Sequence, residues 1–525
     1  MKRGQARAVL AGAALATALA LPVASADHTP SGNLTFEVSS SADEVDSNPG
    51  DGDCVATSGE CTLRAAIQEA NALSGHQTIV LPPGEFVLTR DGYEENASAV
   101  GGLDVLDDVT IVGAGSSVTG VTEDAFAVDR IFDVREGVVS ITDVAIHDVF
   151  MSSILSNDGA CGGGIRNFSD LTVSRVVVRK NTFRGGGGGI CSNSGTLRLS
   201  DSLIEGNIAA LTGPGGGVMN ASGLAILERL VISSNRSDTT GGGGIANYGS
   251  MVVRDSLITD NSTEGQADGA GGIDNRQAPG GQGYLLVINS TISANRGDPQ
   301  GGSGGGGISS KDGGVATLVN STVVGNEASA SQASGIYTRN DGSKTTLVNT
   351  LVADNDSANC PPNGFWALPG SLGHNLDSDG SCQLAGPGDL SEVDPLLGGL
   401  ADNGGPTMTH ALLAGSPARN AGDNAECPEG DQRGAPRNVG ACDIGAFEAG
   451  SVVPPPAPLP GDVDCDGALT PFDMLALLRH TGSLGAPPPC IALADLDCDG
   501  DIDLADALIL LRRLTGFIDP PCDPG

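Results

Sequence analysis

Two acidic loops near the C-terminus hold the residues of this sequence whose spacing is best suited to chemistry. The loops lie 33 residues apart, and each has Gly at its sixth position. Oxygen ligands at positions 1, 3, 5, 7, 9 and 12 are typical of a twelve-residue calcium loop, here with Asp instead of Glu at position 12. Clustered carboxylates without a cation would repel one another, so we expect two Ca²⁺ ions. The predicted ligands are Asp462, Asp464, Asp466, Ala468 (backbone carbonyl), Thr470 and Asp473, and Asp495, Asp497, Asp499, Asp501, Asp503 and Asp506.

Each loop runs into one short helix, expected at 474–480 and 507–514 with Leu and Ile on the buried face. This duplicated loop and helix, residues 461–525, resembles a type I dockerin. The resemblance implies a cohesin-like partner, contacted through loop positions 10 and 11, which are Pro471, Phe472, Leu504 and Ala505 here. The cysteines repeat with a spacing of 25 and 24 residues, which predicts a disulfide within each copy: Cys465 with Cys490, and Cys498 with Cys522.

A repeat of 25 to 35 residues occupies the middle of the chain. Its first anchor is an apolar residue after a glycine cluster, and its second is an Asn that has a β-branched residue three positions before it. The first anchors are Ile165, Ile190, Val218, Ile245, Ile273, Ile308 and Ile336, and the second are Asn181, Asn207, Asn235, Asn261, Asn295, Asn326 and Asn355. Short apolar–polar alternations between the anchors indicate strands. Because one such unit cannot bury its own inner face, stacked units must form a parallel β-solenoid, and crossover geometry favours a right-handed one.

Two features of the repeat have expected structural roles. The glycine clusters should form corners that need positive φ and close approach of neighbouring coils. The repeated Asn side chains should stack at one turn and bond to the next coil. A helix expected at 61–71 should cap the first coil, because an open edge would aggregate.

Both ends of the solenoid resemble known bacterial surface proteins. The segment Cys-Thr-Leu-Arg-Ala-Ala at 61–66, followed by the apolar run 78–86, is similar to the CSLREA-type N-terminal segment of β-helix proteins. Residues 372–448, with Asp-Asn-Gly-Gly-Pro-Thr at 402–407 and Asp-Ile-Gly-Ala-Phe-Glu at 443–448, resemble the choice-of-anchor Q domain. The two resemblances imply a right-handed parallel β-helix that is secreted or displayed.

Composition and the N-terminus indicate an exported chain. The 525 residues carry 27 Lys and Arg against 64 Asp and Glu, a net charge of −37, which argues against nucleic acid as a partner. A basic start, an apolar run and Ala24-Ser25-Ala26 form a signal peptide, after which no segment is apolar enough to span a membrane. We therefore expect an extracellular or cell-surface location. The twelve cysteines suit an oxidising compartment. Further candidate pairs are Cys54 with Cys61, Cys360 with Cys382, and Cys427 with Cys442, and the pairing of Cys161 and Cys191 is left open.

The expected organisation is all-β, with a small α-helical calcium module at the C-terminus. Its parts are a signal peptide (1–26), an N-terminal cap with the first coils (27–150), a glycine-rich β-helix (151–359), C-terminal coils (360–449), a proline-rich linker (450–460) and the module (461–525).

Two functions remain open for the solenoid. β-Helices include pectate lyases and polygalacturonases, but the repeats contain no Gly-His-Gly and no Arg-x-Lys. The acids of the repeats are scattered, namely Asp201, Asp255, Asp260, Asp268 and Asp274, and we expect Arg166, Arg254 and Arg276 to be solvated. The favoured hypothesis is therefore a non-enzymatic, adhesin-like scaffold that contacts a glycan or a partner. The alternative is a polysaccharide lyase or glycoside hydrolase that carries a dockerin.

Overall fold

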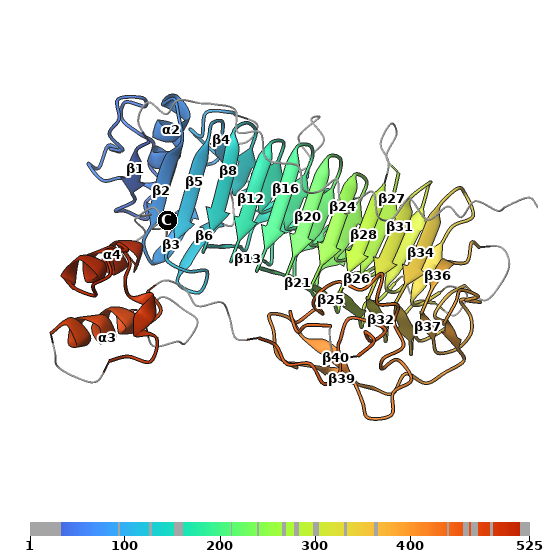
Figure 1. Cartoon of the computed structure of the whole chain (residues 1–525). Coiled ribbons are helices and arrows are strands. Elements are labelled where there is room, and N and C mark those ends of the chain that lie inside the picture. The colour runs from blue at the N-terminus through green and yellow to red at the C-terminus, as the bar shows by residue number, and fades with distance from the viewer. Residues whose placement is uncertain are drawn as a thin grey trace, which may run out of the picture.

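The structure is a stack of β-coils followed by a small helical module (Figure 1). It is a computed structural model, which describes residues 33–92, 95–124, 129–151, 161–211, 213–238, 241–264, 269–277, 283–297, 304–329, 333–361, 366–437, 440–454, 461–463, 471–482 and 487–514. The predicted signal peptide lies outside these residues, and so does Asp268.

Four parallel sheets form the walls of the solenoid, and we number them in the order in which one coil passes through them. Sheet 1 contains β1 (Thr35–Glu37), β2 (Gln77–Leu81), β5 (Val109–Gly113), β8 (Val138–Thr142), β12 (Asp170–Ser174), β16 (Thr196–Ser200), β20 (Leu224–Glu228), β24 (Ser250–Arg254), β28 (Tyr284–Ile288), β31 (Val315–Val319), β34 (Lys344–Val348) and β36 (Gly370–Gly373). Sheet 2 contains β3 (Gly84–Leu88), β6 (Thr119–Glu123), β9 (Ala145–His147), β13 (Val177–Arg179), β17 (Leu203–Glu205), β21 (Val231–Ser233), β25 (Leu257–Thr259), β29 (Thr291–Ser293), β32 (Thr322–Val324), β35 (Leu351–Ala353), β37 (Leu376–Asp377) and β38 (Leu390–Ser391).

The other two walls are narrower. Sheet 3 contains β10 (Phe150–Met151), β14 (Thr182–Phe183), β18 (Ile208–Ala209), β22 (Arg236–Ser237) and β26 (Ser262–Thr263). Sheet 4 contains β4 (Leu103–Val105), β7 (Phe132–Val134), β11 (Ile165–Asn167), β15 (Ile190–Ser192), β19 (Val218–Asn220), β23 (Ile245–Asn247), β27 (Ile273–Arg276), β30 (Ile308–Lys311) and β33 (Ile336–Thr338).

The register of sheet 4 confirms the predicted repeat. Each apolar anchor pairs with the anchor of the next coil, from Ile165 with Ile190 to Ile308 with Ile336. These side chains are fully buried and form part of one core that runs through the solenoid. The predicted all-β parallel solenoid is therefore correct: stacking the coils buries an inner face that no single coil could bury.

The predicted Asn ladder is also present, at the corner between sheets 2 and 3. In each coil the Asn amide nitrogen donates to the Asn oxygen of the next coil, at 3.0 Å from Asn207 to Asn235 and from Asn235 to Asn261. The backbone N–H of Asn207 donates to the same Asn235 oxygen at 2.9 Å. All the ladder residues from Asn181 to Asn326 are fully buried, so the side chains satisfy backbone groups that water cannot reach.

The glycine clusters serve the corners before sheet 4, as expected. Gly187 has φ of 67°, a left-handed conformation that glycine adopts at little cost. At Gly188 an added Cβ would lie 2.5 Å from the backbone carbon of Ile208 and 2.6 Å from the carbonyl oxygen of Gly216. The coils approach too closely here for a larger residue.

A helix closes the N-terminal end. Helix α2 (Leu63–Ala72) is capped by Thr62, whose hydroxyl accepts a hydrogen bond from the backbone of Ala65 at 3.1 Å. The buried Arg64 donates to Asp43 and to the carbonyl oxygens of Ser98, Gly101 and Gly102. This helix fits the predicted cap at 61–71.

After the last coils the chain turns back along the outside of sheet 2. We call residues 394–437 and 440–454 the return segment; it contains the antiparallel strands β39 (Leu397–Ala401) and β40 (Thr409–Leu412), which lie beside β25 to β32 in Figure 1. Thr291 donates to Gln432 at 2.6 Å, and Ser293 bonds His410 at 3.0 Å. The segment thereby covers the outer face of sheet 2 from β25 onward.

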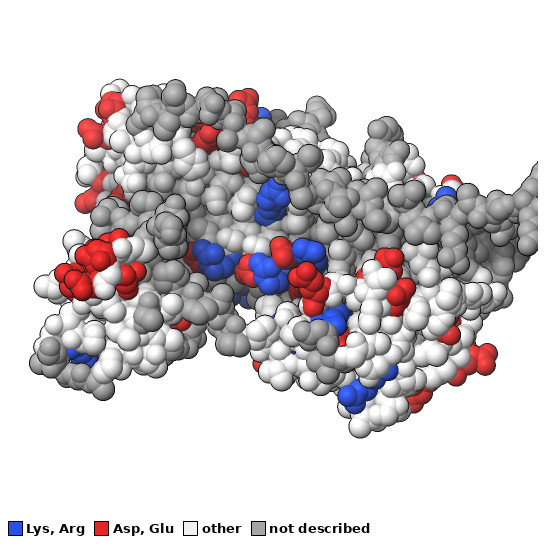
Figure 2. All heavy atoms as spheres, in the orientation of Figure 1, with Lys and Arg blue, Asp and Glu red and all other residues white. Residues whose placement is uncertain are grey.

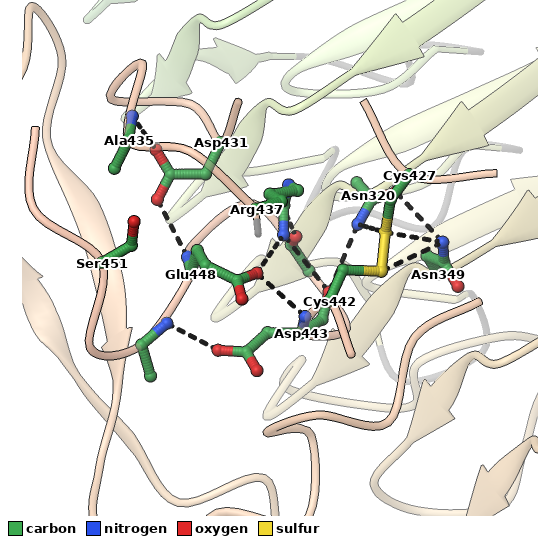
Figure 3. A network of polar contacts seen from close by, with 12 residues as sticks. Asn320, Asn349, Cys427, Asp431, Ala435, Arg437, Cys442, Asp443, Glu448 and Ser451 are labelled. Atoms are coloured by element: carbon green, nitrogen blue, oxygen red, sulfur yellow. Dashed lines mark hydrogen bonds and ion pairs between the residues drawn. A yellow bond between two sulfur atoms is a disulfide. The ribbon is translucent and has the colours of Figure 1, made fainter. Parts of the chain in front are cut away.

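Buried polar contacts fix the return segment (Figure 3). Arg437, whose side chain is 1% exposed, donates to Glu448 at 3.1 Å and to Asn289 at 3.1 Å. Asn349 donates to the backbone of Asp423 at 3.1 Å. The disulfide between Cys427 and Cys442 lies in the same network.

The disulfides within the described solenoid match the sequence-based candidates. Cys54 pairs with Cys61, Cys360 with Cys382, and Cys427 with Cys442. The open question is also answered, because Cys161 pairs with Cys191 across two coils. Among the helices that the structure describes, none has the length and apolar character needed to cross a membrane.

Candidate functional site

The second acidic loop brings together three of its predicted calcium ligands. Carboxylate oxygens of Asp495, Asp497 and Asp499 all lie within 4.8 Å of one another. Asp506, which is 1% exposed, closes the loop by accepting hydrogen bonds from the backbone of Leu496 at 2.6 Å and Asp503 at 2.8 Å. Asp501 and Asp503 lie in the same loop, and both are exposed.

The electrostatics of this loop suit a cation. Oδ1 of Asp495 is buried and has no hydrogen-bond partner. A hydrogen bond from the backbone of Asp499 lowers the pKa of Asp497, but desolvation and the neighbouring carboxylates outweigh it, and the net shift is upward. A divalent cation would satisfy the unpartnered oxygen and relieve this repulsion, so the residues fit Ca²⁺.

The first loop is described only at its ends. Asp462 and Asp473 are buried, and Asp473 accepts a hydrogen bond from the backbone of Val463 at 2.9 Å, the counterpart of the Asp506 bond. Asp464, Asp466, Ala468 and Thr470 lie outside the described residues. The last Asp of each loop thus accepts a backbone hydrogen bond from the residue after its first Asp, as expected for two copies of one loop.

Two helices follow the loops and start earlier than predicted. Helix α3 spans Pro471–Thr481 and α4 spans Leu504–Leu514, because each helix already begins inside the acidic loop; the short 3₁₀-helix η1 (Ile491–Leu493) lies between them. They share a small core that includes Leu477 and Leu510.

The predicted partner positions are partly visible. Leu504 is 69% exposed and Ala505 is exposed, whereas the side chains of Pro471 and Phe472 lie outside the described part. Leu475 and Leu508, which hold equivalent positions in the two copies, are also exposed. The apolar surface therefore extends beyond the four predicted residues.

The cysteines of the module are engaged. Cys490 and Cys498 are each disulfide-bonded, and their predicted partners Cys465 and Cys522 fall outside the described residues. The pairing within each copy stays a prediction.

A groove on the outer face of sheet 2 is a second candidate site. Its volume is about 330 Å³, within the range of small-molecule sites. Its floor consists of Val177, Leu203 and Val231, and its rim contains Arg175, Asp201, Arg229, Ser116 and Pro406. Figure 2 shows basic and acidic side chains next to each other near the middle of the molecule, at the lower ends of the sheet 1 strands in this view.

One corner position supplies the charged rim. The residue between sheets 1 and 2 has a positive φ in every coil from Asp143 to Asn349, for example 53° at Arg175 and 52° at Arg229. We call this row the corner ladder: Asp143, Arg175, Asp201, Arg229, Asp255, Asn289, Asn320 and Asn349. Its three Asn residues bind the return segment. Of its five charged residues, Arg175, Asp201 and Arg229 border the groove.

Charged residues of the corner ladder form ion pairs between neighbouring coils. Arg175 bonds both oxygens of Asp143 at 2.8 and 2.6 Å, and Arg229 bonds both oxygens of Asp201 at 2.6 and 2.8 Å. The hydrogen bond from Arg229 lowers the pKa of Asp201, whereas burial raises the pKa of Asp255 to about 6. Because Arg229 occupies the corner between them, these two carboxylates do not form a facing pair of the kind glycoside cleavage needs.

Two of the arginines expected to be solvated are not. Arg166 is 1% exposed and bonds Asp133. Although burial opposes it, the hydrogen bond from Arg166 helps to lower the pKa of Asp133. Arg276 has a side chain only 14% exposed and bonds Asp274 at 2.5 Å. The expectation was wrong because both arginines pair with a buried acid of sheet 4: Arg166 with Asp133 on the adjacent strand β7, and Arg276 with Asp274 two residues earlier on its own strand β27. Arg254 alone of the three is exposed.

Asp274 and Lys311 form a buried pair of opposite charges, a combination that also occurs in catalytic sites. Asp274 and Lys311 are both fully buried, with Nζ of Lys311 3.4 Å from Asp274. A base or acid that acts on a polymer must reach it, and these groups are closed off in this conformation.

Comparisons with known proteins add a likeness of fold. No family model and no curated protein matches the chain. Among solved structures, pectate lyase Pel9A is 14% identical over 80% of this chain and 97% of that chain, with a TM-score of 0.42. The A-modules of mannuronan C-5 epimerases AlgE6 and AlgE4 from Azotobacter vinelandii are 17% and 16% identical, over 63% of this chain and 90% and 92% of theirs, with TM-scores of 0.28. At these values no activity can be transferred, and the three family resemblances remain predictions.

Proposed function

We propose that the chain is an exported β-helix scaffold that contacts a polysaccharide and is held on a partner by a calcium-dependent, dockerin-like module. The convergence of Asp495, Asp497 and Asp499 carries the proposal, because it supplies the oxygen ligands that Ca²⁺ prefers. The exposed Leu504 and Leu508 supply apolar surface for a cohesin-like partner. Four disulfides among the described residues of the N-terminal cap, the coils and the return segment suit an extracellular or cell-surface location.

The solenoid is the part that would contact the polysaccharide. Its core is filled, and its open outer surface offers the groove on sheet 2 with polar groups at the rim. Paired acids and arginines there suit binding better than cleavage, since each arginine is already bonded to a carboxylate.

The test uses the mature chain with xylan, pectin, polygalacturonate and alginate, with and without Ca²⁺. We expect retention on at least one polymer and no new reducing ends or unsaturated uronides. Product above an inactive control would instead support the lyase or hydrolase alternative, and would direct mutagenesis to the accessible acids and arginines of the repeats, such as Asp201, Arg229 and Arg254.

A further inference from the structure

Among the described residues, the outer face of sheet 2 is covered by the return segment from β25 onward and is partly open at β13, β17 and β21. Its outward row reads Val177, Leu203 and Val231 in the open coils and continues with Leu257 and Thr291 under the return segment. The last two are fully buried, whereas the first three are partly exposed. The groove is therefore the uncovered continuation of a surface that already holds one extended chain.

The rim of this groove compensates its own charge. Its charged lining residues are Arg175, Asp201 and Arg229. Both arginines are paired: Arg175 with Asp143, and Arg229 with Asp201 and Glu228. An acidic polymer would therefore find no unpaired arginine among the lining residues, on a chain whose net charge is −37. A neutral ligand needs no free positive charge and is not repelled by the acidic chain, so charge favours a neutral one.

The rim also keeps free hydrogen-bonding capacity. The Arg175 side chain is 58% exposed, and a guanidinium has more N–H donors than one carboxylate can take. Each carboxylate has lone pairs left after a bidentate contact. Such donors and acceptors suit hydroxyl groups, while the aliphatic floor suits the C–H face of a sugar ring.

Spacing and conformation point the same way. Arg175 and Arg229 lie two coils apart, about 10 Å, so that one coil advances by nearly the length of a sugar unit. The corner position has a positive φ in every coil from Asp143 to Asn349, so the fold itself sets the same backbone conformation at both arginines.

From these observations we infer that the groove binds a neutral, hydroxyl-rich polysaccharide along the solenoid axis. The inference rests on the proposed function and deepens it. Val177, Leu203 and Val231 pack against the sugar rings, and Arg175, Asp201 and Arg229 bond their hydroxyls.

The test compares the mature chain with the double variant Arg175→Ala/Arg229→Ala by affinity electrophoresis in xylan and in polygalacturonate. The matched control is Arg296→Ala, which breaks another exposed ion pair, with Glu327 at 2.9 Å, away from the groove. Leu203→Ser is a second groove variant in case the double variant does not fold, which circular dichroism would report.

We expect the chain to bind xylan in preference to polygalacturonate, and the groove variants to lose at least about tenfold in affinity while the control does not. If xylan binding is unchanged in both groove variants, or if polygalacturonate binds more tightly, the inference is wrong and the proposed glycan contact stands. If the chain binds neither polymer nor any other tested glycan, the proposed function itself fails.

Discussion

Replacing one rung of the Asn ladder should destabilise the solenoid strongly. In Asn235→Ala the backbone N–H and the side-chain amide of Asn207 lose their common acceptor, and the carbonyl oxygen of Ile204 loses a donor at 2.9 Å. Each buried group left without a partner costs about 1–3 kcal/mol. We therefore expect the free energy of unfolding to fall by about 3–5 kcal/mol, since the three losses are not fully additive.

Urea unfolding of the mature chain, followed by circular dichroism, measures this loss. Because a long solenoid can unfold in parts, hydrogen exchange of the Asn207 amide gives a local readout. Asn193→Ala is the matched control, as the hydrogen bonds described for Asn193 involve its backbone only. If Asn193→Ala and Asn235→Ala shift the midpoint equally, the hydrogen bonds of the Asn ladder do not stabilise the fold.

Three further substitutions test other parts of the structure. Burial, aided by the charge of Asp133, raises the pKa of Asp104 from 3.8 to about 7. Between about pH 4 and pH 7 the native state holds a proton that the unfolded state has released, so the free energy of unfolding falls as the pH rises. Asp104→Asn should remove this contribution, which amounts to up to about 4 kcal/mol over that range. Urea unfolding at several pH values measures the dependence, and an unchanged slope in the variant would contradict the raised pKa of Asp104. Arg437→Ala should cost about 3–5 kcal/mol by leaving its buried carboxylate partner unpaired, and faster proteolysis within 394–454 would report it. Gly188→Ala should destabilise the fold by about 1–3 kcal/mol and lower the melting temperature, because its Cβ would clash with the backbone of the neighbouring coil. Gly399→Ala is the control and should leave the melting temperature unchanged, because a Cβ added there has no atom within 4 Å.

The repeat could be predicted because the same residue types recur at the same offsets in each unit. Identical offsets placed the apolar anchors on sheet 4 and the Asn residues at one corner, and stacking geometry did the rest. The convergence of Asp495, Asp497 and Asp499 could also be predicted, since these residues are close in sequence, whereas calcium binding by the loops stays a prediction.

The groove was not predicted from the sequence, although the repeats contain a pattern that marks its rim. Six residues before each repeated Asn stands a corner-ladder residue, from Arg175 and Asp201 to Asn320 and Asn349, so aligning the repeats would have revealed the row. Its division into an open and a covered part depends on the return segment. Contacts such as Thr291 with Gln432 join residues 141 positions apart, which no local pattern encodes.

The buried arginines were missed for a related reason. Arg166 occupies an outward position of a strand, where a solvated side chain is the ordinary outcome. Its burial comes from the pairing with Asp133 on the adjacent strand and from cover over sheet 4, both long-range effects.

Calcium titration of the chelator-treated mature chain by isothermal calorimetry tests the central claim most directly. We predict two bound Ca²⁺ ions per chain, loss of one in Asp497→Ala, and no loss in Asp170→Ala, which alters an exposed acid on the solenoid. Absence of binding heat, together with a circular dichroism spectrum that Ca²⁺ does not change, would contradict the calcium-dependent module and the docking role built on it.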